Sequence, residues 1–525
     1  MPTKNEVEGV KYNYTVDSVT EDETKVLREL ISELKRELER YKTPPLMVAE
    51  IKEKINNGAI IKIQNGNQFM VNISVGCEKI DPGDQVLVEQ KHLTIIKKVG
   101  ISKDFDVEIY GLNPEVLESV LQKFGKIHVV GKSFGVLKLK TSSAEYDFSL
   151  PRRESKTGKG HRGFMVTPDS AMSFQESASR RDFTVNSIGY DLLTNKLLDP
   201  FDGLVDLKNK ILRHVGPAFV DDPLRVLRAM QFSARLEFKI APETVRLCKK
   251  LDLAELSRER IFEEFRKLLL KAQRPSIGLK AAKKLGILAY FPEIKALIGV
   301  PQDPEWHPEG DVWTHTLLVL DEAASLRKGD EKQDLVLMFS ALCHDFGKPL
   351  TTEFLRGRWR SPAHDVDGVD PTKQFLLRLT DDRDLIEQVT TLVKEHLRPV
   401  QLFKVREQIN SGTIRRLALR VRIPELVLLA KADYLGQAPS KEQRASFEAG
   451  DWLLAEAERM EVRDEAPRPL LMGRHLLAMG MSPGPEMGEF LSQAFEKQLN
   501  GDLQTEDDAI SWAKSNLPTL SSLAH

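Results

Sequence analysis

The sequence predicts a multidomain α+β protein in which two β-rich regions precede a long helical half. Short apolar runs separated by turn residues fill residues 46–99, and a strand with two carboxylates one residue apart follows at Lys103–Glu108. From about Pro242 onward, apolar residues recur at helical spacing. With 525 residues, the chain is long enough for three or more domains, each with its own core.

Composition excludes several classes of protein. The net charge of −2 provides no global field for nucleic acid, so any RNA binding must use local patches. The three scattered cysteines, Cys77, Cys248 and Cys343, form no disulfide framework and suit a reducing compartment. The N-terminus lacks the apolar core of a signal peptide, and no apolar run approaches the roughly 20 residues that cross a bilayer. We therefore expect a cytoplasmic protein that does not contact a membrane.

Residues 20–42 predict a short coiled coil. Apolar residues alternate at spacings of four and three, at Leu27, Ile31, Leu34, Leu38 and Tyr41. About three heptads are marginal alone, so we expect a homo-oligomer that a neighbouring domain helps to hold. The alternative is a single amphipathic helix packed on its own chain.

Residues 46–99 predict five short strands in a small OB-type barrel. Turns punctuate them at Asn56-Asn57-Gly58, Asn65-Gly66-Asn67 and Asp81-Pro82-Gly83-Asp84. The helix, the break at Pro44-Pro45 and these strands together resemble the N-terminal part of archaeal proteasome-activating ATPases. That resemblance implies a role in assembly, not proteolysis, because the chain contains no Gly-x-x-x-x-Gly-Lys-Ser/Thr motif.

The strand at Lys103–Glu108 carries Asp104 and Asp106 on one face, since side chains alternate along a strand. Paired carboxylates form a hard oxygen site that suits Mg²⁺ beside the phosphates of a nucleotide. The alternative is an ordinary solvated strand face.

An α/β pattern continues after this strand. We expect a helix at 114–124 and strands at 126–130, 135–139 and 146–150. A basic stretch with glycines then spans Arg152–Arg162, where Arg152 and Arg153 are candidates for phosphate or RNA contacts. The alternative is a solvated loop.

Three further motifs follow in order. They are Arg180-Arg181-Asp182, the run Leu198–Leu207, and a helix start at Asp221-Asp222-Pro223 with a capping aspartate and a proline in the first turn. Together with the paired carboxylates, they resemble the class II tRNA nucleotidyltransferases, the CCA-adding enzymes and their poly(A) polymerase relatives. The resemblance implies a polymerase-β-like head over 100–215 and a helical neck and base-reading domain over 216–300.

The resemblance also implies roles for individual residues. Asp104 and Asp106 are the catalytic pair that binds Mg²⁺. The nucleotide-binding residues are Arg181, Asp182, Asp222, Arg225, Arg228, Glu259 and Arg260. Asp222 and Arg225 match a pair that reads C or A: a carboxylate accepts from the base amino group, and a guanidinium donates to the neighbouring ring nitrogen. The alternative for this pair is a helix cap with an i,i+3 ion pair.

The head departs from the family pattern at its start. Family members begin with a strand that runs into Gly-Gly-x-Val-Arg-Asp, whose glycines let backbone amides approach the phosphates. Here Gly100-Ile101-Ser102 leads straight into the paired carboxylates. We therefore expect a truncated head that lacks one strand, unless Leu93–Lys98 is borrowed from the barrel.

A second constellation lies in the helical half. His315 stands on a helix, His344-Asp345 ends the apolar helix Leu335–Cys343, and Asp433 follows much later, after His364 and His396. This resembles the HD phosphohydrolase domain of some bacterial CCA-adding enzymes, here over 301–440. The resemblance implies that His315, His344, Asp345 and Asp433 bind a divalent transition metal such as Ni²⁺, Mn²⁺ or Co²⁺. Lys348 is a candidate phosphate contact; its alternative role is a favourable charge at a helix end.

Residues 441–525 resemble the tRNA-contacting tail of the same family. The leading hypothesis is a tRNA nucleotidyltransferase that takes CTP and ATP and extends RNA 3′ ends, joined to a metal-dependent phosphohydrolase. The second is a phosphohydrolase of RNA ends or nucleotides with an inactive head, and the third an oligomeric RNA-binding protein without catalysis. The fourth is a fusion or misassembled reading frame near Gly100.

Overall fold

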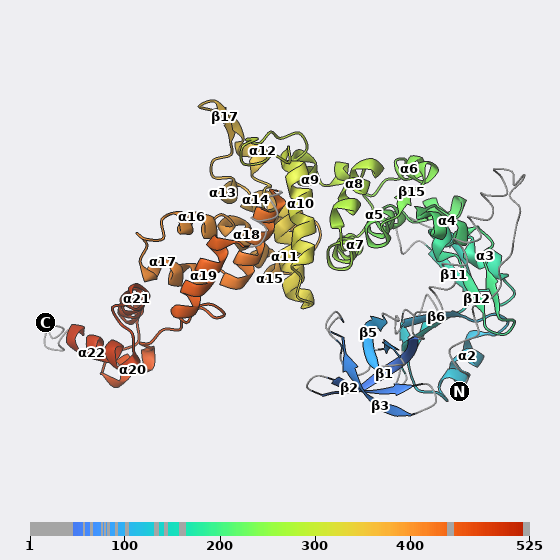
Figure 1. The fold of residues 1–525 in the computed structure, drawn as a ribbon, viewed down its shortest axis with the longest axis horizontal. Helices are drawn as coiled ribbons and strands as arrows, with labels where there is room; N and C mark the ends of the chain where they lie inside the picture. The colour runs from blue at the N-terminus through green and yellow to red at the C-terminus, as the bar shows by residue number, and fades with distance from the viewer. Residues whose placement is uncertain are drawn as a thin grey trace, which may run out of the picture. The chain divides into compact units, whose positions relative to one another are not determined.

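A computed structural model (Figure 1) describes residues 46–55, 58–63, 67–74, 77, 80, 85–89, 93–99, 104–130, 136–140, 145–156, 164–437 and 446–517. The predicted coiled coil at 20–42 lies outside the described residues. The chain divides into two compact units. The first extends to Ser149, apart from Tyr110–Pro114, and the second comprises that segment and Leu150 onward.

Five strands of the first unit close into a barrel, with neighbours in the order β1-β2-β3-β5-β4. They are β1 (Leu46–Ile55), β2 (Gly58–Ile63), β3 (Gln68–Ile73), β4 (Gln85–Glu89) and β5 (Thr94–Val99). Neighbours are antiparallel except β3 and β5. Fully buried residues such as Ile51, Ile61 and Ile95 fill the interior. The described residues thus contain five strands where the sequence predicts five, and their identity as an OB-type barrel stays a prediction.

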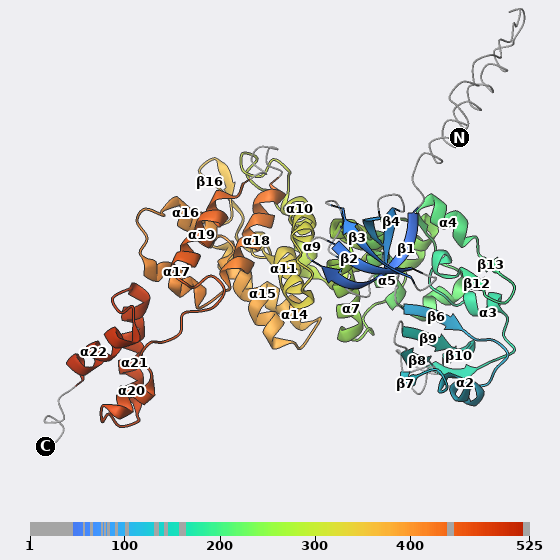
Figure 2. The same ribbon diagram turned by 60° about the horizontal axis from the view of Figure 1, so that its bottom comes forward.

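A four-stranded sheet follows in the order β6-β9-β8-β7 (Figure 2). Its strands are β6 (Asp104–Glu108), β7 (Lys126–Val130), β8 (Val136–Lys140) and β9 (Glu145–Ser149), and helix α2 (Pro114–Leu121) lies between β6 and β7 in the chain. Among the described residues, β6 pairs only with β9, in parallel, so it forms the edge of the sheet. Strand β5 stays in the barrel, where it pairs with β3 and β4. Among the described residues, this sheet therefore does not borrow Leu93–Lys98 from the barrel, and the loss of a strand from the head stays a prediction.

The second unit begins with a hairpin of β10 (Arg152–Lys156) and β11 (Phe164–Pro168). The alternative interpretation of Arg152–Arg162 as a solvated loop is thus wrong for its first five residues. Short elements complete this region: α3 (Phe174–Ala178), η2 (Thr184–Asn186), β12 (Gly189–Asp191), β13 (Lys196–Leu198), α4 (Gly203–Asn209), β14 (Ile211–Leu212), η3 (Pro217–Asp221) and β15 (Lys239–Ile240).

Helices α5 to α9 lie within 216–300, where the sequence predicts a neck, and are called the neck below. They are α5 (Leu224–Leu236), α6 (Pro242–Cys248), α7 (Arg258–Lys271), α8 (Pro275–Leu285) and α9 (Pro292–Ala296), with η4 (Ile287–Tyr290) between the last two. The neck shares one hydrophobic core with the helices that follow. Phe375 is fully buried, and its ring meets Phe265 and Phe291 of the neck region at 6.0 Å each. Burial and edge-to-face ring contacts therefore join the neck to the next domain.

The next domain is a helical bundle that carries the small hairpin β16 (Glu353–Leu355) and β17 (Arg358–Arg360). Its helices are α10 (Val312–Ser325), α11 (Glu331–Cys343), α12 (Lys348–Thr351), α13 (His364–Asp367), α14 (Val369–Leu377), α15 (Arg383–Glu395), α16 (Arg398–Lys404), α17 (Ser411–Ala418) and α18 (Ile423–Gly436). A Cβ added at Gly436 would lie 2.9 Å from the backbone nitrogen of Val319, so glycine lets α18 approach α10 closely.

Helix α19 (Glu448–Arg459) packs against the bundle core. The tail then forms a separate apolar cluster, built by α20 (Gly473–Ala478), α21 (Pro485–Asn500) and α22 (Glu506–Asn516). Among the described residues, no helix combines the length and apolar character that crossing a membrane requires.

Candidate functional site

Strand β6 pairs in register with β9, which sets the neighbours of the predicted catalytic pair. In the parallel pairing with β9, Asp104 stands opposite Glu145 and Asp106 opposite Asp147. Paired positions point to the same face, so Asp147 is a neighbour of the predicted catalytic pair. The Asp106 side chain is exposed, and Asp147 forms a 2.9 Å ion pair with Lys138 of β8. This face therefore concentrates acidic groups that suit Mg²⁺.

Asp182 is buried and pairs with Arg228. Its Oδ2 accepts from Arg228 Nε at 2.6 Å, and its Oδ1 accepts from the backbone amide of Phe183 and from Asn186. The two predicted nucleotide-binding residues thus form one ion pair, although they stand 46 positions apart. Arg181 beside Asp182 is exposed. Such an arrangement orients the Arg228 guanidinium, which also lies 5.0 Å from the Phe232 ring.

Asp222 and Arg225 are held separately, without an ion pair between them. Asp222 caps α5 by accepting from the backbone amide of Leu224, and its other oxygen accepts from Arg260 Nη2 at 2.7 Å. Arg225 donates to the carbonyl oxygens of Ala218 and Arg180 at 2.5 and 2.6 Å. The contact from Arg260 agrees with its predicted orienting role.

Two other predicted contacts are engaged locally. Glu259 caps the start of α7, where hydrogen bonds from its own backbone amide and from Ser257 lower its pKa. Arg153 on β10 donates to Asp169 at 2.7 Å, while the neighbouring Arg152 is half-buried. Their roles toward a nucleotide or RNA stay predictions.

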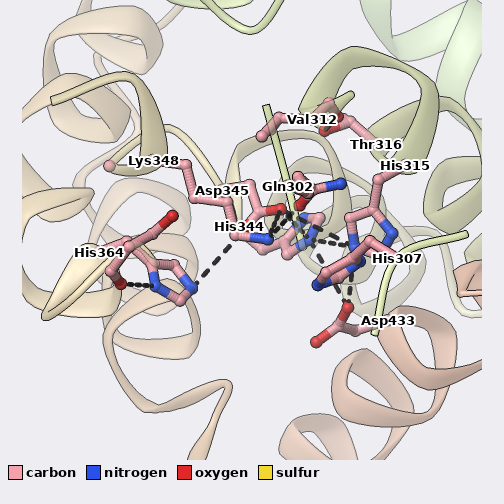
Figure 3. Close-up of polar contacts among 12 residues, drawn as sticks. Gln302, His307, Val312, His315, Thr316, His344, Asp345, Lys348, His364 and Asp433 are labelled. Atoms are coloured by element: carbon pink, nitrogen blue, oxygen red, sulfur yellow. Dashed lines mark hydrogen bonds and ion pairs between the residues drawn. The ribbon is translucent and has the colours of Figure 1, made fainter. Parts of the chain in front are cut away.

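The four predicted ligands of the helical bundle converge (Figure 3). His315 comes from α10, His344 and Asp345 follow the end of α11, and Asp433 comes from α18. His315 Nε2 lies 3.3 Å from His344 Nε2 and 2.9 Å from Asp433 Oδ1, and His344 Nε2 lies 3.2 Å from Asp345 Oδ2. Three of these side chains are at most 1% exposed, and that of Asp433 is 17% exposed. Buried imidazoles and carboxylates at these separations are a donor set for a divalent transition metal.

Glu309 fixes the orientation of His315. Its Oε1 accepts from Nδ1 of both His315 and His307, at 2.7 and 2.8 Å. Nδ1 of His344 likewise donates to the Ala341 carbonyl at 2.9 Å. Each histidine therefore turns Nε2 toward its neighbours, as a metal ligand requires.

Charge at this centre favours a cation. Burial alone lowers the pKa of His315, but hydrogen bonds to Asp433 and Glu309 outweigh it and raise this pKa to about 9. Burial raises the pKa of Glu309, yet hydrogen bonds from His307 and His315 lower it to about 2. The pKa of Asp345 is held well below its usual range, because nearby His344 and Lys348 outweigh the effect of burial. Positive charge among these carboxylates is thus stabilised.

Lys348 is buried and engaged. Its Nζ lies 2.8 Å from Asp345 Oδ2 and donates to Gln302 Oε1 at 2.7 Å. Gly347 precedes it where a Cβ would come within 2.1 Å of the His364 carbonyl oxygen, so only glycine permits this approach of α12 to α13. The predicted phosphate contact of Lys348 stays a prediction.

A cavity of about 360 Å³ opens beside these groups. Its lining includes the buried Asp345 and Lys348, and also the exposed Arg358, Trp359 and Arg360 of β17. Sequence reasoning missed Glu309, Gln302 and this hairpin. Glu309 had one signal, a carboxylate shortly before a helix that carries a candidate ligand, whereas the hairpin residues carry no local signal of function.

Comparisons with known proteins agree with this organisation. Three family models match: Poly A polymerase head domain over residues 93–213, Probable RNA and SrmB- binding site of polymerase A over 237–298, and HD domain over 312–437. The first match begins at Leu93, just before barrel strand β5. The fold and the site therefore define a nucleotidyltransferase-type head joined to an HD domain.

The chain is similar to several bacterial proteins that carry the name multifunctional CCA protein. It is 39% identical over 381 residues to the protein of Xanthomonas campestris pv. campestris (strain B100), and the aligned region covers 70% of this chain and 87% of the relative. It is 38% identical over 346 residues to the protein of Xylella fastidiosa (strain 9a5c), and the aligned region covers 64% of this chain and 80% of that relative. The chain belongs to the multifunctional CCA protein family.

A solved structure agrees at the level of the fold. The Bacillus stearothermophilus CCA-adding enzyme in complex with CTP is 19% identical, with a TM-score of 0.52, over 77% of this chain and 86% of that chain.

Proposed function

We propose that this protein adds CMP and AMP from CTP and ATP to the 3′ ends of tRNA. The observation that carries this proposal is membership of the multifunctional CCA protein family, together with the register that puts Asp106 beside Asp147 on β6 and β9. Asp104 and Asp106 would hold Mg²⁺, which would activate the RNA 3′-hydroxyl for attack on the α-phosphate and stabilise the charge on the departing pyrophosphate. Acidic groups on one strand face fit this hard cation.

The other proposed residues, from the head and the neck, serve the nucleotide. Arg228, oriented by Asp182, is a donor for phosphate or sugar oxygens. Asp222, whose carboxylate is positioned by Arg260, accepts from the amino group of C or A, while Arg225 reads the neighbouring ring nitrogen. U and G present a carbonyl at the amino position and are repelled.

The test uses tRNA transcripts that lack their 3′ CCA end. Purified protein with Mg²⁺ should incorporate labelled CTP and ATP, but not labelled UTP or GTP. The Asp106→Asn variant should lose incorporation. No labelling by the wild-type protein at saturating Mg²⁺ would refute the proposal.

We also propose that the HD domain is a metal-dependent phosphohydrolase. His315, His344, Asp345 and Asp433 would hold the metal, which polarises a phosphate and activates water. Arg358 and Arg360 at the cavity are donors for phosphate oxygens, and Trp359 offers a stacking surface for a base. This lining favours nucleotides or RNA ends as the substrate class.

The assay for this activity starts from protein treated with a chelator. Hydrolysis of bis(p-nitrophenyl) phosphate and of p-nitrophenyl phosphate should return on addition of Ni²⁺, Mn²⁺ or Co²⁺. The Asp345→Asn variant should stay inactive with every metal. Equal activity of this variant and the wild-type protein would refute the proposal.

A second candidate function is phosphohydrolysis alone, with an inactive head. The position of β6 at the sheet edge, with no Gly-Gly-x-Val-Arg-Asp motif before it, favours this candidate. It predicts hydrolysis without any nucleotide incorporation, so the two assays above distinguish the candidates.

We further propose that residues 20–42 and an OB-type barrel at 46–99 assemble the chain into a homo-oligomer. The closed five-stranded barrel supports this part of the proposal. Light scattering of the full chain should give a multiple of the 59.4 kDa chain mass, reduced by Leu34→Glu in the heptad seam. The proposed domain boundaries are otherwise 100–215, 216–300, 301–440 and 441–525. The three cysteines form no disulfide within the described residues, and this supports a cytoplasmic location.

A further inference from the structure

Two tryptophans line the cavity beside the HD centre, although their segments lie apart in the chain. The HD centre is the proposed metal site formed by His315, His344, Asp345 and Asp433. Trp306 stands in the turn before α10, and Trp359 stands in β17. Their exposed fractions are 59% and 37%. Because burying an aromatic ring of this size is favourable, two rings left open at one cavity indicate a surface for a flat or apolar ligand group.

The hairpin of β16 and β17 supports Trp359. It projects from the bundle beside α12 (Figure 1), and its two-residue turn, Arg356-Gly357, has φ values of 52° and 81°. Two positive φ values are typical of the turn that matches the twist of a hairpin. Trp359 pairs across the strands with Phe354, whose ring meets it edge to face at 5.2 Å. A hydrogen bond of 2.8 Å between the hydroxyls of Thr352 and Ser361 closes the base of the hairpin. The Trp359 ring is therefore held in place without a ligand.

A hydrogen-bonded turn fixes the backbone at Trp306. Its amide donates to the carbonyl oxygen of Asp303 at 3.1 Å, and the amide of His307 donates to the same oxygen at 2.8 Å. The Asp303 carboxylate accepts from the amide of Glu305 at 3.0 Å. The side chain of His307 is anchored in turn on Glu309, 2.8 Å away. The second tryptophan thus also stands on a structured segment.

Two cations flank Trp359 on its strand. Arg358 and Arg360 line the same cavity, both are exposed, and neither forms an ion pair within the described residues. Unpaired guanidinium groups are available to phosphate or sugar oxygens. The buried Asp345 and Lys348 also line this cavity of about 360 Å³, a volume in the range of small-molecule sites. The cavity therefore combines groups suited to a phosphate with aromatic rings suited to a base, the two ends of a nucleotide.

We propose that Trp306 and Trp359 bind the base of the nucleotide whose phosphate lies at the HD centre, and so determine the specificity of this site for nucleotides over base-free phosphate esters. This inference rests on the proposed phosphohydrolase, because it takes the position of the phosphate as given. Stacking uses the π-face that every base has, so the site should accept all four bases with differences of only a few fold. Asp222 and Arg225, in contrast, are proposed to read the edge of a base.

The test compares two inhibitors that differ only in the base, adenosine 5′-monophosphate (AMP) and ribose 5-phosphate. Each competes with bis(p-nitrophenyl) phosphate in the full chain reconstituted with Mn²⁺. AMP should have an inhibition constant about tenfold or more below that of ribose 5-phosphate. Trp306→Leu and Trp359→Leu should each reduce this ratio by about fivefold or more, whereas Trp359→Phe should keep most of it, because a phenyl ring also stacks. Leu355→Ala is the control, since Leu355 is exposed on the same hairpin but does not line the cavity, and it should keep the wild-type ratio.

Tryptophan fluorescence measures base binding independently of hydrolysis. All five tryptophans of the chain lie at position 306 or later, so none belongs to the head. AMP should quench the fluorescence of the full chain, ribose 5-phosphate should not, and both leucine variants should show less quenching. Far-ultraviolet circular dichroism identifies a variant that fails to fold, and quenching of the wild-type protein then still tests the stacking.

Three results would overturn this inference while leaving the proposed phosphohydrolase intact. Equal inhibition of the wild-type protein by AMP and ribose 5-phosphate would mean that the site does not bind the base. A ratio unchanged in both leucine variants would place the base elsewhere, and an effect of Trp359→Leu alone would remove Trp306 from the site. A wild-type protein that hydrolyses no phosphate ester with any metal overturns the proposed function instead, and AMP quenching in that protein would still support the base site.

Discussion

The two candidate sites differ in how the chain supports them. The proposed ligands of the HD centre come from several helices that share one continuous core, and Glu309 and the Ala341 carbonyl hold Nδ1 of His315 and His344 on the side away from the site. The acidic face of the head stands on β6, a five-residue strand with one described neighbour. Asp106 there is exposed, whereas Asp345 is 1% exposed.

This difference shows that a chain can carry the residues of a motif whether or not the surrounding structure holds them firmly in place. Ligands held by a packed core keep their geometry without a bound ion, because each rotamer is locked by neighbours. An edge strand keeps its register through one ladder of hydrogen bonds, so its side chains are fixed along the strand but not from the open side. We therefore expect the HD centre to respond sharply to single substitutions and the head to depend on bound Mg²⁺ and nucleotide.

The largest expected effect is at Asp345, a proposed ligand of the HD centre. Asp345→Asn removes the charge that binds metal, so hydrolysis of bis(p-nitrophenyl) phosphate should fall by about 10³-fold or more, equivalent to several kcal/mol. Nucleotide incorporation should be unchanged, since the head does not use this residue. Asp367→Asn, an exposed aspartate of α13, is the matched control and should retain hydrolysis. A parallel fall in both activities would show that the two sites are not independent.

The reciprocal substitution is Asp106→Asn in the head. Loss of one Mg²⁺ ligand should lower incorporation of CMP by roughly 10²- to 10³-fold while leaving hydrolysis intact. Glu115→Gln, at an exposed position of α2, controls for a change of charge. If the wild-type protein hydrolyses phosphodiesters but incorporates no measurable nucleotide, the head is inactive and only the HD domain is catalytic.

Sequence reasoning succeeded where the pattern was local. Paired carboxylates on a strand, and a His-Asp pair at the end of an apolar helix, are visible as spacing, so β6 and the end of α11 were predicted correctly. Strand β10 could not be predicted, because Arg-Arg-Glu-Ser-Lys has no apolar face. The segment is a strand because it pairs with β11. Two contacts could not be predicted: the ion pair of Asp182 with Arg228, and the hydrogen bond between Glu309 and His315. Both form only when separate segments pack together, and the periodicity of a sequence carries no information about such packing.

Glu309 tests whether the HD centre depends on residues that only orient its ligands, because Glu309 would affect a bound metal through His315. Glu309→Gln keeps the size of the side chain but removes the charge that holds His315 Nδ1, so affinity for Mn²⁺ should fall by about 10- to 100-fold. Calorimetric titration of the chelated protein measures this change. Glu305→Gln, at an exposed position nearby, should leave the affinity unaltered. An unaltered affinity in Glu309→Gln would mean that packing alone orients His315.

The corresponding orienting contact for the proposed nucleotide site is the hydrogen bond from Arg260 to Asp222, in the neck. Arg260→Gln removes a charge-assisted hydrogen bond of 2.7 Å, and discrimination of CTP against UTP should drop by about tenfold, which corresponds to about 1.4 kcal/mol. The ratio of kcat/KM values for the two nucleotides is the measurement, and Arg258→Gln, whose guanidinium pairs with Asp381, is the control. Equal discrimination in the Arg260 variant and the wild-type protein would remove Arg260 from the base-reading role.

The smallest effect concerns pH and the segment that holds Asp182. His214 pairs with Phe183 in an isolated bridge, its Nδ1 lies 2.8 Å from the Thr244 hydroxyl, and burial together with nearby Arg213 lowers its pKa below 6.5. Because the folded protein disfavours protonated His214, its contribution to stability is present above pH 6.5 and is lost as pH falls through the lowered pKa. Denaturant unfolding between pH 7 and pH 5 should show this loss, and His214→Gln should show less of it. The ring proton signals of His214 should titrate with a midpoint below 6.5. A midpoint at or above the ordinary value would mean that this segment of the head is open to water, and that the head is even less well supported than its edge strand indicates.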